Sequence, residues 1–298
     1  MRRIRRPTIL TGRRHIAQAP PDDELYKERV LQRTLAAPVG PDYTQDLETR
    51  FLHSFLSSRS VFVDVGAHSG AYAAVVERVV GSRSMVLVEP LPGLAEVLRA
   101  RFPKSHVVAA ALSDRRGSAT IRIPSIDGRA YATRATLNDH IEPGQSGFEQ
   151  VEVEVRTLDD LVVELRLRRI DVLKVDVEGH ELELLAGGQK TIGRLRPVVL
   201  IEIEARHHTF PLADVFTELE AAGLAGWVFD PRTMQVRRVR DLDPAVDQDI
   251  ARLASRDFLR YLNNFWFVPT ERVDVFLERA GQFLDRLEPL DGPPANPR

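Results

Sequence analysis

Residues 63–72 have the sequence Val63-Asp64-Val65-Gly66-Ala67-His68-Ser69-Gly70-Ala71-Tyr72, in which an apolar run meets two glycines and then a helical pattern. The β-branched run is typical of a buried strand, and the residues from Gly70 to Val80 have helical spacing. Glycines in the turn allow a tight bend and a close approach of backbone to a ligand. The helix start adds free N–H donors. The stretch therefore predicts a ligand-binding strand–turn–helix unit.

Short apolar runs alternate with helical patterns along most of the chain. Strands are expected at 61–65, 84–88, 106–110, 170–175, 197–203, 225–229 and 265–268. This alternation predicts parallel strands with crossover helices on both faces of the sheet. The fold class is therefore α/β, with a doubly wound, mostly parallel, seven-stranded sheet. One helix is expected over 180–192.

Four segments are expected along the chain. They are a basic flexible arm at 1–20, N-terminal helices at 21–58, the main domain at 59–270 and a C-terminal helix with a tail at 271–298. Within the main domain, residues 117–156 break the alternation with two strand-like runs around a polar stretch, which predicts a β-hairpin-like insertion. Long insertions in compact α/β domains tend to be lids or binding loops.

Composition excludes several classes of protein. The chain of 298 residues has no cysteine, which rules out disulfides, thiolate metal sites and a cysteine nucleophile. No apolar run approaches the length of a membrane span, and no secretion signal is recognisable. We therefore expect a cytoplasmic protein. The net charge of −2 gives no general attraction to nucleic acid, although the arginine-rich arm leaves RNA or an acidic partner open.

The spacing of the glycines narrows the kind of ligand. Gly66 and Gly70 form a G-x-x-x-G pattern, which matches neither the dinucleotide fingerprint G-x-G-x-x-G nor a phosphate-binding G-K-[ST] loop. This argues against a nicotinamide oxidoreductase. Glu89 follows at the end of the second strand, where a carboxylate can accept both hydroxyls of a ribose. The two features together favour a nucleoside-containing cofactor.

Longer blocks carry a family resemblance. Asp64-Val-Gly-Ala-His-Ser-Gly70 with Val88-Glu-Pro90 is similar to the cofactor site of class I S-adenosylmethionine-dependent methyltransferases. Blocks at 110–114, 155–160, 171–181 and 196–202 then resemble the FkbM family of methyltransferases, and Lys174-Val-Asp-Val-Glu-Gly179 is the most discriminating. The resemblance covers about 59–204. It implies a Rossmann-like fold and methyl transfer from S-adenosyl-L-methionine to a hydroxyl of a sugar, polyketide or other natural product.

The same resemblance assigns cofactor-binding roles. It implies that the cofactor contacts Asp64, Gly66, His68, Gly70, Glu89, Ser113 and Asp114. Gly66 and Gly70 would let the loop approach the methionine part. Glu89 would hold the ribose, and Ser113 with Asp114 would lie near the adenine.

Methyl transfer to an alcohol also needs a group that takes the hydroxyl proton. The candidate catalytic residues are His180, Asp176, Glu178, Lys174 and Glu202, with His207 and His208 as second candidates for the base. His180 is the first choice, because the start of a helix disfavours imidazolium. Lys174 lies in an apolar strand, so we expect a salt bridge to Asp176, Glu178 or Glu202.

Two other classes of function remain open. A nucleic-acid methyltransferase could use the basic arm, although the fourth strand lacks the Asn/Asp-Pro-Pro-aromatic block of amino-group methyltransferases. A nucleotide-cofactor-binding oxidoreductase is the other alternative. We expect a small-molecule or carbohydrate acceptor and no metal, since no Asp-Asn block follows Asp176. A homodimer is left open.

Overall fold

The computed structural model of the chain describes residues 23–32, 34, 43–138, 141, 144–251 and 261–287. The expected basic arm lies outside these residues, and so does the expected tail at 289–298.

Helices and strands alternate, as the sequence pattern predicts. The helices are α1 (Asp23–Leu31), α2 (Tyr43–Phe55), α3 (Ala71–Val80), α4 (Pro92–Arg101), α5 (Leu158–Glu164), α6 (Glu181–Ala186), α7 (Gln189–Leu195), α8 (Leu212–Ala221), α9 (Pro244–Asp247) and α11 (Val273–Leu284). The strands are β1 (Phe62–Val65), β2 (Met85–Val88), β3 (His106–Val108), β4 (Ala111–Leu112), β5 (Gly117–Ile126), β6 (Arg129–Ala130), β7 (Gln145–Arg156), β8 (Val172–Val175), β9 (Val198–Glu202), β10 (Leu224–Asp230), β11 (Gln235–Arg238) and β12 (Asn264–Pro269).

The main sheet has the strand order β11-β10-β12-β9-β8-β1-β2-β3. Strands β3, β2, β1, β8 and β9 are parallel, and β12 lies antiparallel between β9 and β10. The α/β class and the doubly wound arrangement are confirmed. The sheet has eight strands and not seven, because β11 pairs with the edge of β10. The sequence of β11 gave no strand signal, since Gln235-Val-Arg-Arg238 contains one apolar residue.

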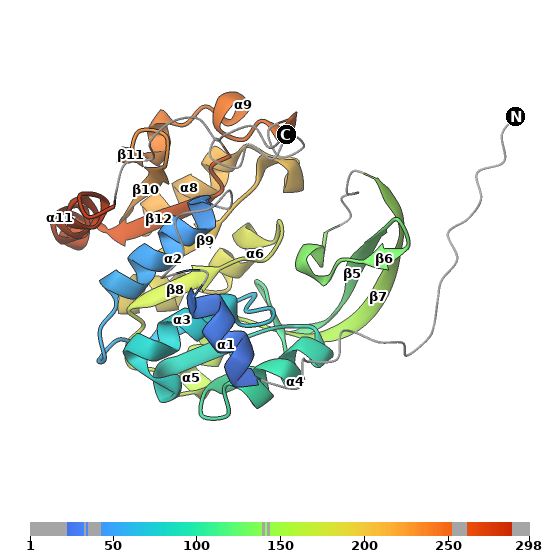
Figure 1. Ribbon diagram of the computed structural model, residues 1–298. Coiled ribbons are helices and arrows are strands. Elements are labelled where there is room, and N and C mark those ends of the chain that lie inside the picture. Colours follow the sequence, from blue (N-terminus) through green and yellow to red (C-terminus); the bar gives the residue numbers. More distant parts are fainter. Residues whose placement is uncertain are drawn as a thin grey trace, which may run out of the picture.

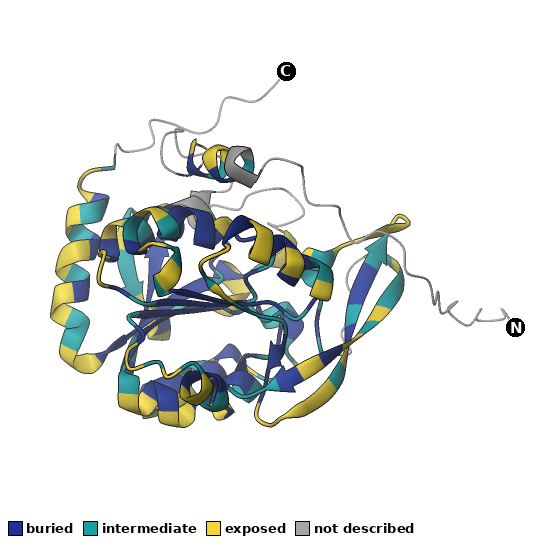
Figure 2. Cartoon of the chain, turned by 90° about the horizontal axis from the view of Figure 1, so that it is seen from below, coloured by how far each residue is buried: buried dark blue, intermediate teal, exposed yellow. Residues whose placement is uncertain are grey.

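Helices cover both faces of this sheet (Figures 1 and 2). Helices α2, α3 and α11 pack on the face that carries Phe62 and Leu200. Helices α5 to α8 pack on the face that carries Val63 and Ile201. Because side chains alternate along each strand, every second residue belongs to the same face. Asp64, two residues after Phe62, therefore lies on the α2–α3 face.

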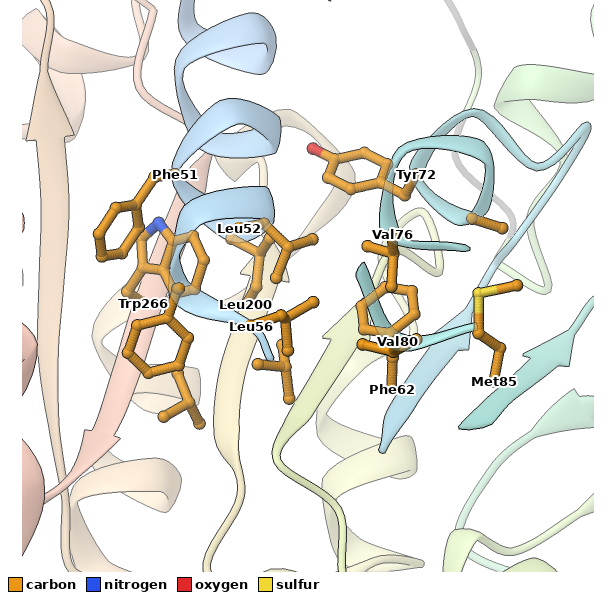
Figure 3. Packing of buried hydrophobic residues seen from close by; sticks show 14 of the residues in the cluster. Phe51, Leu52, Leu56, Phe62, Tyr72, Val76, Val80, Met85, Leu200 and Trp266 are labelled. Atoms are coloured by element: carbon orange, nitrogen blue, oxygen red, sulfur yellow. The ribbon is translucent and has the colours of Figure 1, made fainter. Parts of the chain in front are cut away.

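Helix α2 is part of the core, although it precedes the first strand. Its Phe51 ring has its centroid 5.1 Å from that of Trp266 and 4.9 Å from that of Phe229. Leu52 of the same helix packs beside Leu200 of β9 (Figure 3). Aromatic pairs at these separations add to the free energy of burial.

The segment 117–156 forms the expected hairpin. β5 pairs antiparallel with β7 from Gly117↔Val155 to Ile126↔Gln145, and the pair stands beside the main sheet in Figure 1. With β4 and β6 it makes a second sheet of order β4-β7-β5-β6. Its buried face, which includes Ile121 and Val153, packs on Leu91 and Leu94.

The helix expected over 180–192 is two helices. α6 ends at Ala186 and α7 begins at Gln189, with Gly187 and Gly188 between them. A Cβ on Gly187 would lie 2.0 Å from the carbonyl oxygen of Ser113. The backbone at Gly187 thus packs directly on the loop after β4, a tertiary contact that spacing cannot predict.

Candidate functional site

A cavity of about 290 Å³ lies at the carboxyl ends of the neighbouring strands β9, β8, β1 and β2. Its lining includes the predicted residues Asp64, Gly66, His68, Glu89, Lys174, Asp176, Glu178, His180 and Glu202. Gly70, Ser113 and Asp114 lie outside the lining. Ligands of open α/β sheets bind at this edge, so the fold gathers the predicted residues where such a site is expected.

The turn after β1 is fixed by hydrogen bonds to the next strand. The N–H groups of Gly66 and Ala67 donate to the carbonyl oxygen of Val88, at 2.9 Å and 3.0 Å. Gly66 has a φ of +82°, and a Cβ there would lie 1.8 Å from the carbonyl oxygen of Asp176. Only glycine fits this position. The turn is therefore held between the ends of β2 and β8.

Glu89 faces the cavity from the end of β2. Its carboxylate accepts hydrogen bonds from the N–H of His68 at 2.8 Å and from the N–H of Leu91 at 2.9 Å. The side chain is buried, and this burial raises the pKa of Glu89 to about 7, although the two backbone donors oppose the rise. A buried carboxyl that titrates near neutrality at a cavity wall is typical of a functional site.

Lys174 is the cation of the cavity floor. Its Nζ donates to Asp176 Oδ2 at 2.9 Å and lies 4.0 Å from Asp64 Oδ1. The predicted salt bridge to Asp176 is confirmed. The contact with Asp64 was not predicted and follows from the register, which pairs Asp64 of β1 with Lys174 of β8. Burial raises the pKa of Asp64 to about 6, and Lys174 opposes this rise.

Two further polar groups complete this end of the cavity. Glu202 at the end of β9 accepts a hydrogen bond from Asn263 Nδ2 at 2.8 Å. Burial, and then the negative charge of Asp176, raise the pKa of Glu202. Tyr72 was not predicted, and its ring centroid lies 4.7 Å from Lys174 Nζ. Its position in the first turn of the helix after the glycines is the signal that could have identified it.

His180 lies on the other side of the site. Its Nε2 is 2.9 Å from Ser113 Oγ, and that hydroxyl donates to Asp114 Oδ1 at 3.1 Å. The three residues therefore form one hydrogen-bonded group beside the start of α6. The pKa of His180 is lowered chiefly by burial, whereas the sequence argument had relied on the helix terminus.

The turn after β8 is clamped to the hairpin. Thr136 Oγ1 donates to the carbonyl oxygen of Glu178 at 2.7 Å, and Asn138 Nδ2 donates to that of Gly179 at 2.6 Å. The backbone of Glu178 has a φ of +51°, an uncommon conformation for a residue with a side chain. His207 Nδ1 lies 3.3 Å from Glu178 Oε2. The second candidate bases, His207 and His208, are buried and paired with Glu178 and Glu181.

The hairpin also supplies part of the cavity wall, from residues that the sequence analysis did not name as site residues. Ala132, Thr133, Ala135 and Leu137 line the cavity. These side chains are small or apolar, so nothing in their type marked them. In the described part of the chain, no three acidic or histidine side chains are grouped as a metal site requires. No described helix is long and apolar enough to cross a membrane.

An open α/β sheet with a glycine turn and a buried carboxyl at its carboxyl edge defines a Rossmann-like domain. The model of the methyltransferase FkbM domain matches residues 64–224, just over half of the chain. The protein therefore belongs to the FkbM methyltransferase family, as the resemblance had implied.

Two curated relatives agree with this family. The chain is 28% identical over 146 residues to the 2-O-methyltransferase NoeI of Sinorhizobium fredii, a match that covers 46% of this chain and 60% of that protein. It is 26% identical over 174 residues to the methyltransferase sdnD of Sordaria araneosa, which covers 49% of this chain and 67% of that protein. The chain thus spans about 60% of the length of the first relative.

Solved structures are more distant. A methyltransferase FkbM from Methylobacillus flagellatus has 16% identity and a TM-score of 0.45, with 81% of this chain and 57% of that chain covered. A SAM-dependent O-methyltransferase from Thermotoga maritima has 12% identity and a TM-score of 0.32, with 78% of this chain and 67% of that chain covered.

Proposed function

We propose that the protein is an S-adenosylmethionine-dependent O-methyltransferase that acts on a hydroxyl group. The observation that carries this proposal is the cavity at the carboxyl edge of the sheet, where the turn at Gly66 and the buried carboxyl of Glu89 face one space. Membership of the FkbM family supports methyl transfer as the reaction. The name of the rhizobial relative supports a hydroxyl oxygen as the acceptor.

The polar atoms of the cavity fit an adenosyl sulfonium. Each oxygen of Glu89 accepts one backbone hydrogen bond, which leaves lone pairs for the two hydroxyls of a ribose. Asp64 Oδ1 is buried and has no hydrogen-bond partner in the described structure, so it suits a cationic amine. Ser113 and Asp114 are our candidates for the adenine side. The acidic lining favours a positively charged sulfur.

When bound, the cofactor supplies a methyl group on a positively charged sulfur and departs as a neutral thioether. The acceptor oxygen forms the new bond to carbon with its own lone pair, and the electrons of the sulfur–carbon bond stay on sulfur. The hydroxyl proton passes to a group of the chain. Alignment of the two reactants accounts for up to about 7–11 kcal/mol of the barrier, and a positioned base adds about 10²–10⁴-fold.

We propose Glu202 as the group that takes this proton. Glu202 lines the cavity at the end of β9, and Lys174 of the adjacent strand β8 and Asp176 just after that strand line it too. Burial raises the pKa of Glu202, so its carboxylate accepts a proton more readily than that of an exposed glutamate. His180, the first choice from the sequence, is bonded to Ser113 on the side we assign to the adenine. Asp176 and Glu178 would orient the acceptor, and Lys174 would hold Asp176.

The acceptor is proposed to be a small molecule with several hydroxyls, such as a sugar or a polyketide. The walls that the hairpin supplies are small and apolar, and the floor carries carboxyl groups that accept hydrogen bonds from hydroxyls. A carboxylate or phosphate on the acceptor would be repelled by the same floor. The arginines of the insertion, Arg129 and Arg134, are not part of the cavity lining.

Ligand binding tests this function directly. S-adenosylmethionine and S-adenosylhomocysteine should each raise the melting temperature, whereas NADH and NADPH should not, because a ligand stabilises only the fold that binds it. Stabilisation by the nicotinamides alone would overturn the assignment in favour of an oxidoreductase.

Methyl transfer is then measured with a methyl-labelled cofactor against sugars, polyketide alcohols and RNA. Transfer of the label to an alcohol supports the proposal if the transfer is lost when the proposed base is replaced. Glu202→Gln should lower kcat about 10²–10⁴-fold. Label in RNA only would favour the nucleic-acid alternative.

A further inference from the structure

Asn263 is a polar residue outside the family match, and its side chain contacts the proposed base. It stands just before β12, beyond the matched residues 64–224. Its Nδ2 donates to Glu202 Oε1 at 2.8 Å and to Glu204 Oε1 at 3.3 Å. An amide nitrogen carries two hydrogens, so one asparagine can bind two carboxyls at once. The two acids at the end of β9 are therefore joined through one neutral side chain.

The backbone around Asn263 is fixed to the end of β9. Strand β12 pairs antiparallel with β9, and the N–H of Ile203 donates to the carbonyl oxygen of Asn263 at 2.8 Å. The buried amide of Gln248 donates to the carbonyl oxygens of Ile203 at 2.7 Å and Leu262 at 2.8 Å. Asn263 is therefore held beside Glu202 by the backbone of both segments as well as by its own amide.

Glu204 is the fixed end of this hydrogen-bonded group. Its side chain is buried, and its Oε2 accepts hydrogen bonds from the Tyr261 hydroxyl at 2.8 Å and from Arg206 Nε. Burial opposes ionisation of Glu204, but the hydrogen bonds and charges of its partners, that of Arg206 first, outweigh it and lower the pKa of this carboxyl. Glu204 is thus an ionised acceptor for one amide hydrogen of Asn263, and the other is directed at Glu202.

The two oxygens of Glu202 have different surroundings. Oε1 accepts the hydrogen bond of Asn263, whereas no hydrogen bond reaches Oε2 within the described part of the chain. Glu202 lines the cavity, and Asn263 is not part of that lining. Asn263 therefore holds the carboxyl from outside the cavity and leaves one oxygen for a ligand.

The other groups around Glu202 do not replace this contact. The titratable groups near it are Glu48 on α2, Tyr72 on α3, Lys174 on β8, Asp176 and Glu178 after β8, and Glu204 after β9. Lys174 is the cation among them, and its ion pairs are with Asp176 and Asp64. In the described structure, the bond from Asn263 is thus the one hydrogen bond to the carboxyl of Glu202.

We infer that Asn263 is a positioning residue that fixes the carboxyl of Glu202 for removal of the acceptor proton. This inference rests on the proposed function. The proton of the acceptor hydroxyl passes to Oε2 of Glu202, while Oε1 keeps its bond to Asn263. A neutral amide suits this role, because it orients the carboxyl, whereas a cation in the same place would lower the basicity of the carboxyl much more.

The titration of Glu202 tests this contact without an acceptor. In protein labelled with carbon-13 at the glutamate carboxyls, the NMR signal of Glu202 is the one that Glu202→Gln lacks. A hydrogen bond to the ionised form lowers the pKa of a carboxyl, so Asn263→Leu should raise the Glu202 midpoint by about 1–2 pH units. Asn263→Ala removes the same donor with less bulk and should raise it too. Asn263→Gln keeps both amide hydrogens and should reverse part of the shift.

A split between binding and turnover separates positioning from folding. With methyl-labelled S-adenosylmethionine and the alcohol that accepts the label, kcat of Asn263→Leu should fall about 10-fold or more, a part of what a positioned base provides. The acidic limb of its kcat profile should move to higher pH together with the NMR midpoint. The Kd of S-adenosylhomocysteine should stay at the wild-type value, because Glu202 is not a cofactor contact.

Val215→Ala is the control for a loss of stability alone. Val215 is fully buried on α8 and does not line the cavity. The variant loses apolar packing and no polar contact, so its melting temperature should fall. The Glu202 midpoint and the pH profile of kcat should stay those of the wild type.

Three results would overturn the inference. One is a Glu202 midpoint that does not move in Asn263→Leu and Asn263→Ala, and another is an equal movement in Val215→Ala. The third is a moved midpoint with unchanged kcat and pH profile, because Glu202 would then not be the base that Asn263 positions. If neither S-adenosylmethionine nor S-adenosylhomocysteine binds the wild type, the proposed function has failed and the inference falls with it, a result distinct from an unmoved midpoint.

Discussion

The burial of Glu89 makes the affinity of the site for its ligand depend on pH. Its pKa of about 7 stands above the ordinary 4.5, and burial is the cause. A ribose diol donates hydrogen bonds to the ionised form, so binding favours loss of the proton. We predict that affinity for S-adenosylhomocysteine rises as the pH is raised through about 7, and calorimetry at a series of pH values measures this.

The variant Glu89→Gln should weaken this binding about 10–100-fold, because hydrogen bonds to a charged group contribute about 1.5–3 kcal/mol. Its affinity should also be flat with pH. Glu96→Gln, on the exposed side of α4, is the control. Wild-type affinity and pH dependence in Glu89→Gln would remove the ribose assignment.

Lys174 is a buried cation whose expected contribution is to the stability of the fold. It is 2% exposed and is the cation that Asp64 and Asp176 share. We predict that Lys174→Met lowers the free energy of unfolding by about 3–5 kcal/mol at neutral pH, since it leaves buried carboxylates uncompensated. Urea denaturation measures this. Lys190→Met, an exposed lysine on α7, should stay within about 0.5 kcal/mol of the wild type.

At the scale of elements, the break between α6 and α7 is a packing requirement. A Cβ on Gly187 would lie 2.0 Å from the carbonyl oxygen of Ser113, whereas a Cβ on Gly193 within α7 meets nothing within 4 Å. Gly187→Ala should therefore destabilise the protein by about 1–3 kcal/mol, and Gly193→Ala should stabilise it by up to about 1 kcal/mol. Thermal or urea denaturation compares the pair. Equal effects would mean that the loop after β4 yields easily.

The hairpin is held over the cavity by side chains of the segment after β6. Thr136→Val removes the donor to the Glu178 carbonyl, and we expect faster hydrogen exchange in 132–138 and in 176–180. The loss of one such bond costs about 0.5–1.5 kcal/mol. Thr120→Val, on the exposed face of β5, is the matched control. Unchanged exchange in Thr136→Val would show that the clamp rests on other contacts.

The elements divide clearly into those that spacing predicts and those it does not. Buried strands and their following helices were predictable, because apolar periodicity reports burial directly. Apolar periodicity does not reveal β11, because it is a short exposed edge strand. It does not reveal the break at Gly187 either, because that break depends on a contact with Ser113.

The site divides in the same way. Glycines and acids at strand ends were predictable, since topology alone brings them together. Tyr72 was not, because its contact with Lys174 depends on where α3 lies against the sheet.

At the scale of the whole molecule, the matched family segment is smaller than the folding unit. Residues 64–224 exclude α2, β12 and α11. Yet β12 lies between β9 and β10 in the sheet, and α2 closes the core over it. Helix α2 and strand β12 are therefore part of the core that also carries the site. We expect substitutions in either element to alter the cavity through β9.

Phe51 is the residue on which this integration can be measured. It is fully buried, and its ring contacts Trp266 of β12, Phe276 of α11 and Phe229 of β10. We predict that Phe51→Ala lowers the free energy of unfolding by about 3–5 kcal/mol in a single cooperative transition, because three elements lose the same packing partner. Urea denaturation followed by tryptophan fluorescence reports on Trp266 and on Trp227 of β10, the two tryptophans of the chain. Val275→Ala, an exposed position of α11, should change stability by less than about 0.5 kcal/mol. Two separate transitions in Phe51→Ala, or a loss no larger than that of the control, would mean that α2 is not part of the same folding unit as the sheet.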